Sequence, residues 1–267
     1  MRRLSRLLFL AVLSVAMAAP VAAQENAPAG ELDGFAKIDG TKLRPATLFY
    51  DATVKTGNRS LDLSAIQTVA KTTTGGTDTW ALVNRIKTPR GISTDSLVVD
   101  RSSLLPISRH RSGGAVMNLT YTNTSASGET DVSGTMTRGD RSVSIKKSLE
   151  GPTLAGGVHD VIALGAMPLQ PGFSTTLRVF SPRDQATKRA EFEITGTETV
   201  DTPAGSFETY VVDLNVGDGY VTGTVHLWKE APHYHVKWKT KVSTSRGTRT
   251  ISQTLSSIKM ETPSSAP

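Results

Sequence analysis

The chain has 267 residues, of which 20% are charged and 6% aromatic, with no cysteine and a formal net charge of +6 at pH 7. Without cysteine there can be neither a disulfide nor an acylated lipobox cysteine nor a thiol nucleophile, so an ordinary hydrophobic core must stabilise the fold. Three arginines of the first six residues contribute half of the net charge of +6, and the remaining weakly basic chain gives no indication of nucleic-acid binding.

The first residues have the pattern of a secretory signal peptide. The arginines precede an apolar run, Leu7–Ala19, and Val21–Ala23 supplies small residues for cleavage before Gln24. The run is too short to cross the roughly 30 Å hydrocarbon core, and no later segment approaches about 18 consecutive apolar residues. We therefore expect residues 1–23 to be removed during general secretion, leaving a periplasmic or secreted chain without a transmembrane segment.

The composition changes after the predicted cleavage site. Gln24–Gly30 is small, polar and contains proline, so we expect residues 24–46 to form a partly flexible leader and first turn. Residues 47–260 are predicted to form a single β-domain and residues 261–267 a disordered tail. The segment Glu150–Gly157 fits either a linker or an inter-strand loop, and one domain is favoured because a large sheet usually curls to protect its edges.

From Thr47 onward, period-two patterning, many Thr and Val residues and glycine-rich breaks predict β-strands. The predicted strands are Thr47–Lys55, Ser60–Lys71, Asp78–Lys87, Asp95–Asp100, Ala115–Thr122, Glu129–Thr137, Arg141–Ser148, Ser174–Ser181, Lys188–Val200, Ser206–Val216, Tyr220–Lys229, Tyr234–Ser243 and Thr248–Lys259.

The breaks between these strands are short. Thr74–Thr77, Gly217–Gly219 and Ser245–Gly247 are typical of hairpin turns, which favours a meander. One helix is predicted over Val158–Leu164, closed by Gly165. The fold class is therefore mostly β: a curved antiparallel sheet or open half-barrel of about a dozen strands, with one short helix near the middle of the chain.

Several segments, in their order along the chain, carry a family resemblance. They are Ser96–Asp100 with Ser103–Pro106, His159–Leu164 with Met167–Gly172, Gly196–Val200 with Thr202–Phe207, and Val225–Trp228 with Ala231-Pro232 and Val236-Lys237. Together they resemble a family of exported bacterial β-proteins known only as a domain of unknown function, over Ser96 to Lys241. The resemblance implies a fold similar to the half-barrel of lipoprotein carriers such as LolA and LolB, in which a sheet wraps around a helix and can enclose an acyl chain.

Three histidines are the best candidates for a metal site. Two His at i and i+2, such as His233 and His235, share a strand face and could bind zinc together with His226. A hairpin turn centred on Ala231 instead places His226 on the apolar face and the other two beside the lysines at 237, 239 and 241. A turn shorter by one residue would reverse this and bring His226 opposite His235.

Other catalytic patterns are weak. His159 and Asp160 are helix neighbours that do not face each other, and an acidic residue at this position more often stabilises the helix N-terminus. Ser206 lacks the first and last glycines of the Gly-x-Ser-x-Gly pattern around an α/β-hydrolase nucleophile, and it precedes a strand. We therefore expect no catalytic residue, no metal site, no cofactor and no enzymatic activity.

The aromatic residues are the candidate ligand-binding residues. Trp80, Tyr220, Trp228, Tyr234 and Trp238 fall at period-two positions of predicted strands, where they form either core or the wall of an apolar cavity. The alternating lysines Lys237, Lys239 and Lys241 fit a solvated strand face that discourages edge aggregation, or a surface for lipid phosphate or acidic glycan.

The sequence leaves three functional hypotheses. The leading one is a non-enzymatic periplasmic protein that binds a lipid or other apolar molecule in the concave face of its sheet. The second is a cell-envelope scaffold that engages another protein through its sheet surface or an edge strand. The third is a metal-dependent hydrolase that uses His226 and His235.

Overall fold

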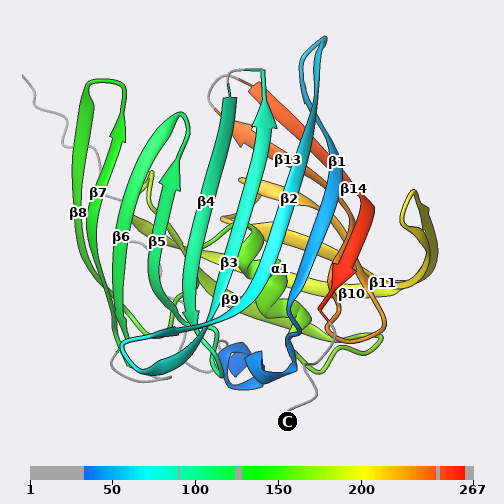
Figure 1. Ribbon diagram of the computed structural model, residues 1–267, viewed down its shortest axis with the longest axis horizontal. Helices are drawn as coiled ribbons and strands as arrows, with labels where there is room; N and C mark the ends of the chain where they lie inside the picture. The colour runs from blue at the N-terminus through cyan, green and yellow to red at the C-terminus, as the bar shows by residue number, and fades with distance from the viewer. Residues whose placement is uncertain (1–32, 90, 124–127, 245–246, 262–267) are drawn as a thin grey trace, which may run out of the picture. The chain divides into compact units, whose positions relative to one another are not determined.

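One antiparallel sheet of 14 strands makes up most of the fold (Figure 1). The computed structural model describes residues 33–89, 91–123, 128–244 and 247–261. The strands are β1 (Ala46–Thr56), β2 (Arg59–Thr74), β3 (Thr77–Thr88), β4 (Gly91–Asp100), β5 (Pro106–Ser112), β6 (Ala115–Asn123), β7 (Thr130–Arg138), β8 (Arg141–Leu149), β9 (Ser174–Ser181), β10 (Ala186–Thr202), β11 (Gly205–Val216), β12 (Val221–Trp228), β13 (His235–Thr244) and β14 (Gly247–Met260).

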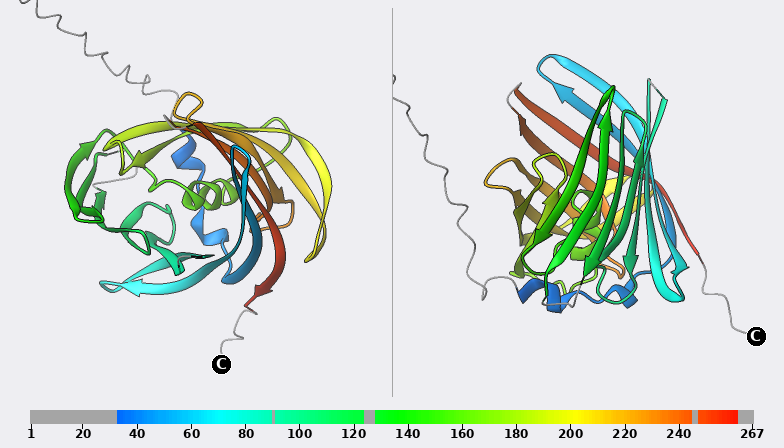
Figure 2. Two further views of the ribbon diagram at one scale, coloured as in Figure 1. Left: turned by 90° about the horizontal axis from the view of Figure 1, so that it is seen from above. Right: turned by 90° about the vertical axis from the view of Figure 1, so that its left-hand side faces the viewer.

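The strand order is β8-β7-β6-β5-β4-β3-β2-β1-β14-β13-β12-β11-β10-β9. Every ladder joins strands that follow each other in the chain, except that β1 pairs with β14, from Ala46 opposite Met260 to Thr56 opposite Arg249. No ladder between the described strands joins β8 to β9, so the sheet is open. It curls around the one α-helix of the described residues, α1 (Val158–Gly165), which lies on its concave side (Figure 2).

Alternating burial explains why these segments form strands. In β6, Met117, Leu119 and Tyr121 are buried, whereas Asn118 and Thr120 between them are exposed. Successive side chains of a strand point to opposite faces, so the apolar set of each strand faces the concave side and the polar set faces solvent.

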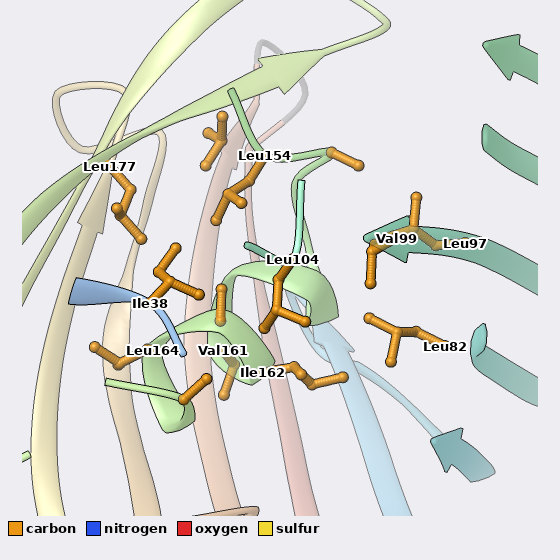
Figure 3. Close-up of a cluster of buried hydrophobic side chains, with 14 of the residues drawn as sticks. Ile38, Leu82, Leu97, Val99, Leu104, Leu154, Val161, Ile162, Leu164 and Leu177 are labelled. Atoms are coloured by element: carbon orange, nitrogen blue, oxygen red, sulfur yellow. The ribbon is translucent and has the colours of Figure 1, made fainter. Parts of the chain in front are cut away.

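Helix α1 forms the centre of the core (Figure 3). Its Val161, Ile162 and Leu164 are buried and meet apolar side chains from the strands and loops around them. Gly165 lies so close to the loop before β13 that a Cβ atom there would stand 3.0 Å from the backbone oxygen of His233. A larger residue at position 165 would therefore push α1 away from the sheet.

Two short 3-10 helices, η2 (Asp33–Lys37) and η3 (Gly40–Lys42), precede β1. Phe35 and Ile38 are buried in the core, and the backbone amide of Asp39 donates to the oxygen of Ala166, 3.0 Å away. The packed structure thus begins well before β1, in a segment that the sequence assigned to the leader. The predicted signal peptide, the segment 24–30 and the tail 262–267 lie outside the described residues.

The predicted fold class is confirmed. All thirteen predicted strands are present with bounds close to those expected, β9 over Ser174–Ser181 as predicted, and α1 covers the predicted helix. Strand β5 was not predicted. Its sequence, Pro-Ile-Ser-Arg-His-Arg-Ser, shows no apolar alternation because two of its inward positions are the arginines Arg109 and Arg111. The meander prediction is right except at the β1–β14 ladder and the long connection that carries α1.

Candidate functional site

The concave face contains a cavity of about 390 Å³ beside the first turn of α1. This volume lies within the range of roughly 300–1,000 Å³ that is common for small-molecule sites. One wall is apolar and comes from the middle of the sheet: Ala52, Val54, Leu63, Ala65, Ile86, Val242 and Ile251. Val158 and Ile162 of α1 contribute further apolar surface.

Beside these apolar residues, four polar residues of the lining form a row across four neighbouring strands. Gln67 of β2 pairs with Asn84 of β3, Asn84 with Asp95 of β4, and Asp95 with Arg111 of β5. All four residues line the cavity, and we call them the polar row. Gln67 is 2% exposed and its Nε2 has no hydrogen-bond partner in the structure, whereas Arg111 at the other end is exposed to solvent. The cavity therefore extends from the interior to the surface.

Arg109 holds the polar row in place. Its Nε and Nη2 lie 2.9 and 2.7 Å from the two carboxylate oxygens of Asp95, and its Nη1 donates to the backbone oxygen of Ala155. Burial alone would lower the pKa of Arg109, but the hydrogen bonds with Asp95 and the charge of that carboxylate outweigh burial and raise it. The guanidinium stays charged and connects β4, β5 and the loop before α1.

A second cavity, of about 240 Å³, adjoins the first. It is lined by Val161 of α1, Phe192 of β10 and Leu214 of β11, and it shares Arg109 and Trp238 with the first cavity. Asp160 also lines it. Burial raises the pKa of Asp160 to about 7, although the positive charge of Arg109 opposes this shift.

His159 has a structural role at the start of α1. Its Nδ1 accepts a hydrogen bond from the backbone amide of Ala155 at 3.1 Å, and its Nε2 donates to the oxygen of Leu104 at 2.9 Å. Burial lowers the pKa of His159 to about 3, so the ring is neutral. These contacts tie the β4–β5 turn to the loop before α1, which agrees with the structural interpretation of this residue.

His235 lies under the cavity wall. Its ring stacks on Tyr50 with a centroid separation of 4.5 Å and meets Trp238 edge-on at 5.6 Å. Burial lowers the pKa of His235 to about 4. A hydrogen bond with the side chain of Gln253 opposes this shift. The Nε1 of Trp238 has no hydrogen-bond partner in the structure.

The predicted faces of two histidines were wrong. The register places His226 opposite Lys237 and Leu227 opposite His235, with an irregularity between His226 and Leu227. Val236 is the extra residue of β13, because it has no opposite partner in β12. Both His235 and Val236 are buried in the core, so His235 does not share the outer face of the lysines. His226 lies instead on the outer face, where its Nε2 is 2.7 Å from Glu198 Oε1.

The histidine metal site of the third hypothesis is not assembled. His226 and His235 lie on opposite faces of the sheet, and His233 contacts the backbone oxygen of Trp228 at 2.9 Å. Within the part of the chain that the structure describes, no three His, Cys, Asp or Glu side chains gather as a metal-binding group.

The five candidate aromatic residues separate into two groups. Trp238 lines both cavities and Tyr220 lines the smaller one. The other three are absent from both linings: Trp80 is fully buried and donates its Nε1 to the oxygen of Gly40, Tyr234 donates to the oxygen of Arg44, and Trp228 packs edge-on against Phe207. Trp80 and Tyr234 belong to the packed core, and Trp228 is a partly buried residue packed against it.

Sequence reasoning did not identify the polar row or Arg109. Gln67, Asn84 and Asp95 are ordinary polar residues in three separate strands, and only the register between the strands brings them together. The available signal was the pair Arg109 and Arg111 at i and i+2, which would have suggested an inward charged face had β5 been recognised as a strand.

The alternating lysines face outward. Lys237, Lys239 and Lys241 pair with His226, Thr224 and Thr222 of β12, on the face away from the cavity. No helix in the described ranges is long and apolar enough to cross a membrane.

Comparison with known proteins gives a fold and a family. A β-barrel-like protein of the domain of unknown function DUF1849 from Brucella abortus is similar at a TM-score of 0.53 and 11% identity, over 82% of this chain and 99% of that one. A protein from Bacteroides fragilis described as exported, with a YmcC-like fold, reaches a TM-score of only 0.31 at 12% identity, over 84% and 99% of the two chains. No curated protein matches the sequence significantly. The model of a family described as "Protein of unknown function (DUF3108)" matches residues 50–254.

Proposed function

Since the chain belongs to the DUF3108 family, whose description states no activity, we propose that it is a non-enzymatic protein of the cell envelope that binds a lipid or other apolar molecule in the concave face of its sheet. The signal-peptide pattern of residues 1–23 supports an exported location. The cavity beside α1 supports the binding role.

The cavity of about 390 Å³ is the observation that carries the proposal. An interior built only for stability is packed with few voids larger than a water molecule. Here a large space remains on the concave side, with an apolar wall built from the central strands β1, β2 and β14. Transfer of an apolar ligand from water to such a wall is favourable by roughly 25 cal/mol per Å² of buried apolar surface.

The first experiment is native mass spectrometry of the mature protein purified from the periplasm, with denaturing mass spectrometry of the same sample. We expect an adduct in the native spectrum that is absent from the denaturing one. The adduct should be an apolar molecule, which tandem fragmentation then identifies. A bare native mass, together with no uptake of any apolar probe, would contradict the proposal.

A cavity-filling variant tests the location of the adduct. Ala65 is buried and lines the cavity, so Ala65→Phe should reduce or abolish the adduct by occupying the space. Leu63→Trp, nearer the end of the same strand, is a second variant should Ala65→Phe unfold. Ala81→Phe is the matched control because Ala81 alternates with the inward residues Trp80 and Leu82 and is absent from the lining. An adduct that persists in both filling variants would place the ligand elsewhere.

A further inference from the structure

The unpartnered polar groups around the cavity are mainly hydrogen-bond donors. Gln67 Nε2 and Trp238 Nε1 are buried and have no partner, and both residues line the cavity. Burying a donor without an acceptor is unfavourable, so two such groups in the lining of one cavity indicate that an acceptor belongs there. A purely hydrocarbon ligand would leave both groups unpaired.

The charge at the mouth of the cavity is positive. Both oxygens of Asp95 are engaged by Arg109, which neutralises that carboxylate. Arg111 lines the cavity on the next inward position of β5, and no carboxylate among the described residues forms an ion pair with it. Asn84, which pairs with Asp95, adds an uncharged amide between Gln67 and Arg111. The polar row therefore presents one uncompensated positive charge at its exposed end.

The polar row and the apolar wall line the same cavity. Ala52, Val54 and Ile251 provide hydrocarbon surface, while Gln67, Asn84 and Arg111 provide polar groups. The cavity volume of about 390 Å³ is near the lower end of the common range for ligand sites, which fits one chain better than a bulky multi-chain lipid.

We infer that the cavity selects a single-chain amphiphile with an anionic, hydrogen-bond-accepting head group, which lies along the polar row with its charge at Arg111 and its hydrocarbon chain on the apolar wall. This inference rests on the proposed function and specifies its ligand class. Arg109 is a positioning residue: it fixes Asp95 and the strand register, while Arg111 and Gln67 contact the head group.

The test uses delipidated mature protein and three probes that share one tetradecyl chain: tetradecanoate, tetradecanol and tetradecyltrimethylammonium. Binding is measured below the critical micelle concentration by calorimetry and by tryptophan fluorescence. We expect tetradecanoate to bind about tenfold or more tightly than tetradecanol, because a hydrogen bond between charged groups is stronger than one with a neutral hydroxyl. The ammonium probe should bind most weakly.

Variants assign the preference to the polar row. Arg111→Gln should weaken tetradecanoate binding about tenfold and leave tetradecanol unchanged, because only the anion uses the charge. Gln67→Leu should weaken tetradecanoate and tetradecanol binding together, since both probes carry an acceptor oxygen. Arg85→Gln is the matched control: Arg85 is exposed, alternates with the inward Asn84 and Ile86 of β3, and is absent from the cavity lining. Thermal unfolding establishes that each variant is folded.

The outcomes separate the inference from the proposed function. Equal binding of the three probes, or an Arg111→Gln effect no larger than that of Arg85→Gln, would overturn the inference and leave an apolar-ligand protein. Failure of all three probes to bind, with a bare native mass, would overturn the proposed function as well. A carboxylate preference that Arg111→Gln removes would support both.

Discussion

Arg109 and Asp95 form a two-point ion pair on the concave face of the sheet, with Nε–Oδ1 and Nη2–Oδ2 distances of 2.9 and 2.7 Å. Their side chains are only 13% and 24% exposed, so water screens the attraction between the two charges only weakly. Removing one partner leaves a largely buried charge without compensation. We expect Arg109→Met to cost about 3–5 kcal/mol of the free energy of unfolding, measured by urea denaturation.

The matched control is the exposed pair of Arg101 and Asp78, whose side chains are 37% and 66% exposed. Arg101→Met should cost less than about 1 kcal/mol because solvent screens this pair. The double variant Arg109→Met with Asp95→Leu should recover part of the lost stability, since neither charge then remains. If Arg109→Met and Arg101→Met lowered the free energy of unfolding equally, burial would not make the inner ion pair more important for stability than the exposed one.

His159 should make the protein sensitive to acid. Its pKa is lowered by burial to about 3, below the ordinary value of 6.5, so the unfolded chain binds a proton that the folded one rejects. Stability from this group is present above pH 6.5 and is lost as the pH falls toward 3. We expect the melting temperature to fall between pH 7 and pH 4, and to fall less steeply in His159→Gln. The exposed His110 gives the control His110→Gln, which should retain the slope of the parent protein.

Asp160 should act in the opposite direction. Burial raises its pKa to about 7, so the folded protein holds a proton that the unfolded chain releases above about pH 4. The contribution to stability is therefore lost as the pH rises from about 4 to 7. Asp160→Asn removes this loss, so its melting temperature relative to the parent should increase from pH 5 to pH 8. The gain should not exceed a few kcal/mol. A difference that stays constant across this range would contradict the raised pKa.

Trp80 and Trp238 should respond differently to substitution. Trp80 is fully buried and bonded to the oxygen of Gly40, so Trp80→Ala should cost about 3–5 kcal/mol of stability. The milder Trp80→Phe, which retains most of the buried volume, should leave probe binding unchanged. Trp238 lines both cavities, and Trp238→Phe should weaken binding of tetradecanoate by removing the indole donor. Calorimetry measures the affinity of the two Phe variants for tetradecanoate. An equal loss of affinity in both would contradict the assignment of Trp80 to the core and Trp238 to the cavity wall.

The sequence was most informative where one side of a strand is apolar. The alternation in β6 and β9, and the apolar run of α1 with its closing Gly165, are local signals that tertiary packing reinforces. Strand β5 lacked such a signal because Arg109 and Arg111 occupy inward positions. A strand with polar residues at its inward positions therefore lacks the apolar alternation that identifies strands in a sequence.

The site itself depends on register, which is not local. Gln67, Asn84, Asp95 and Arg111 become neighbours only when the ladders of β2 to β5 are known. The histidines illustrate the same limit: one additional residue opposite His226 and Leu227 was enough to exchange the faces of His226 and His235. Trp238 and Tyr220 were predicted as aromatic strand residues, but sequence periodicity could not separate them from the core residue Trp80.

The ladder between β1 and β14 joins strands from opposite ends of the β-domain, which affects how the domain folds. Every other ladder joins consecutive strands, and here the backbone amide of Glu261 donates to the oxygen of Pro45 at 3.0 Å, so the two ends of the β-domain meet in the middle of the sheet. The two halves, β1–β8 and β9–β14, can each form as a local meander, but their union requires closure of a loop that spans nearly the whole domain. Linking the end of β14 to the start of η2 and opening the chain between β8 and α1 would give a chain in which every ladder joins consecutive strands, with a lower contact order and no long-range closure step.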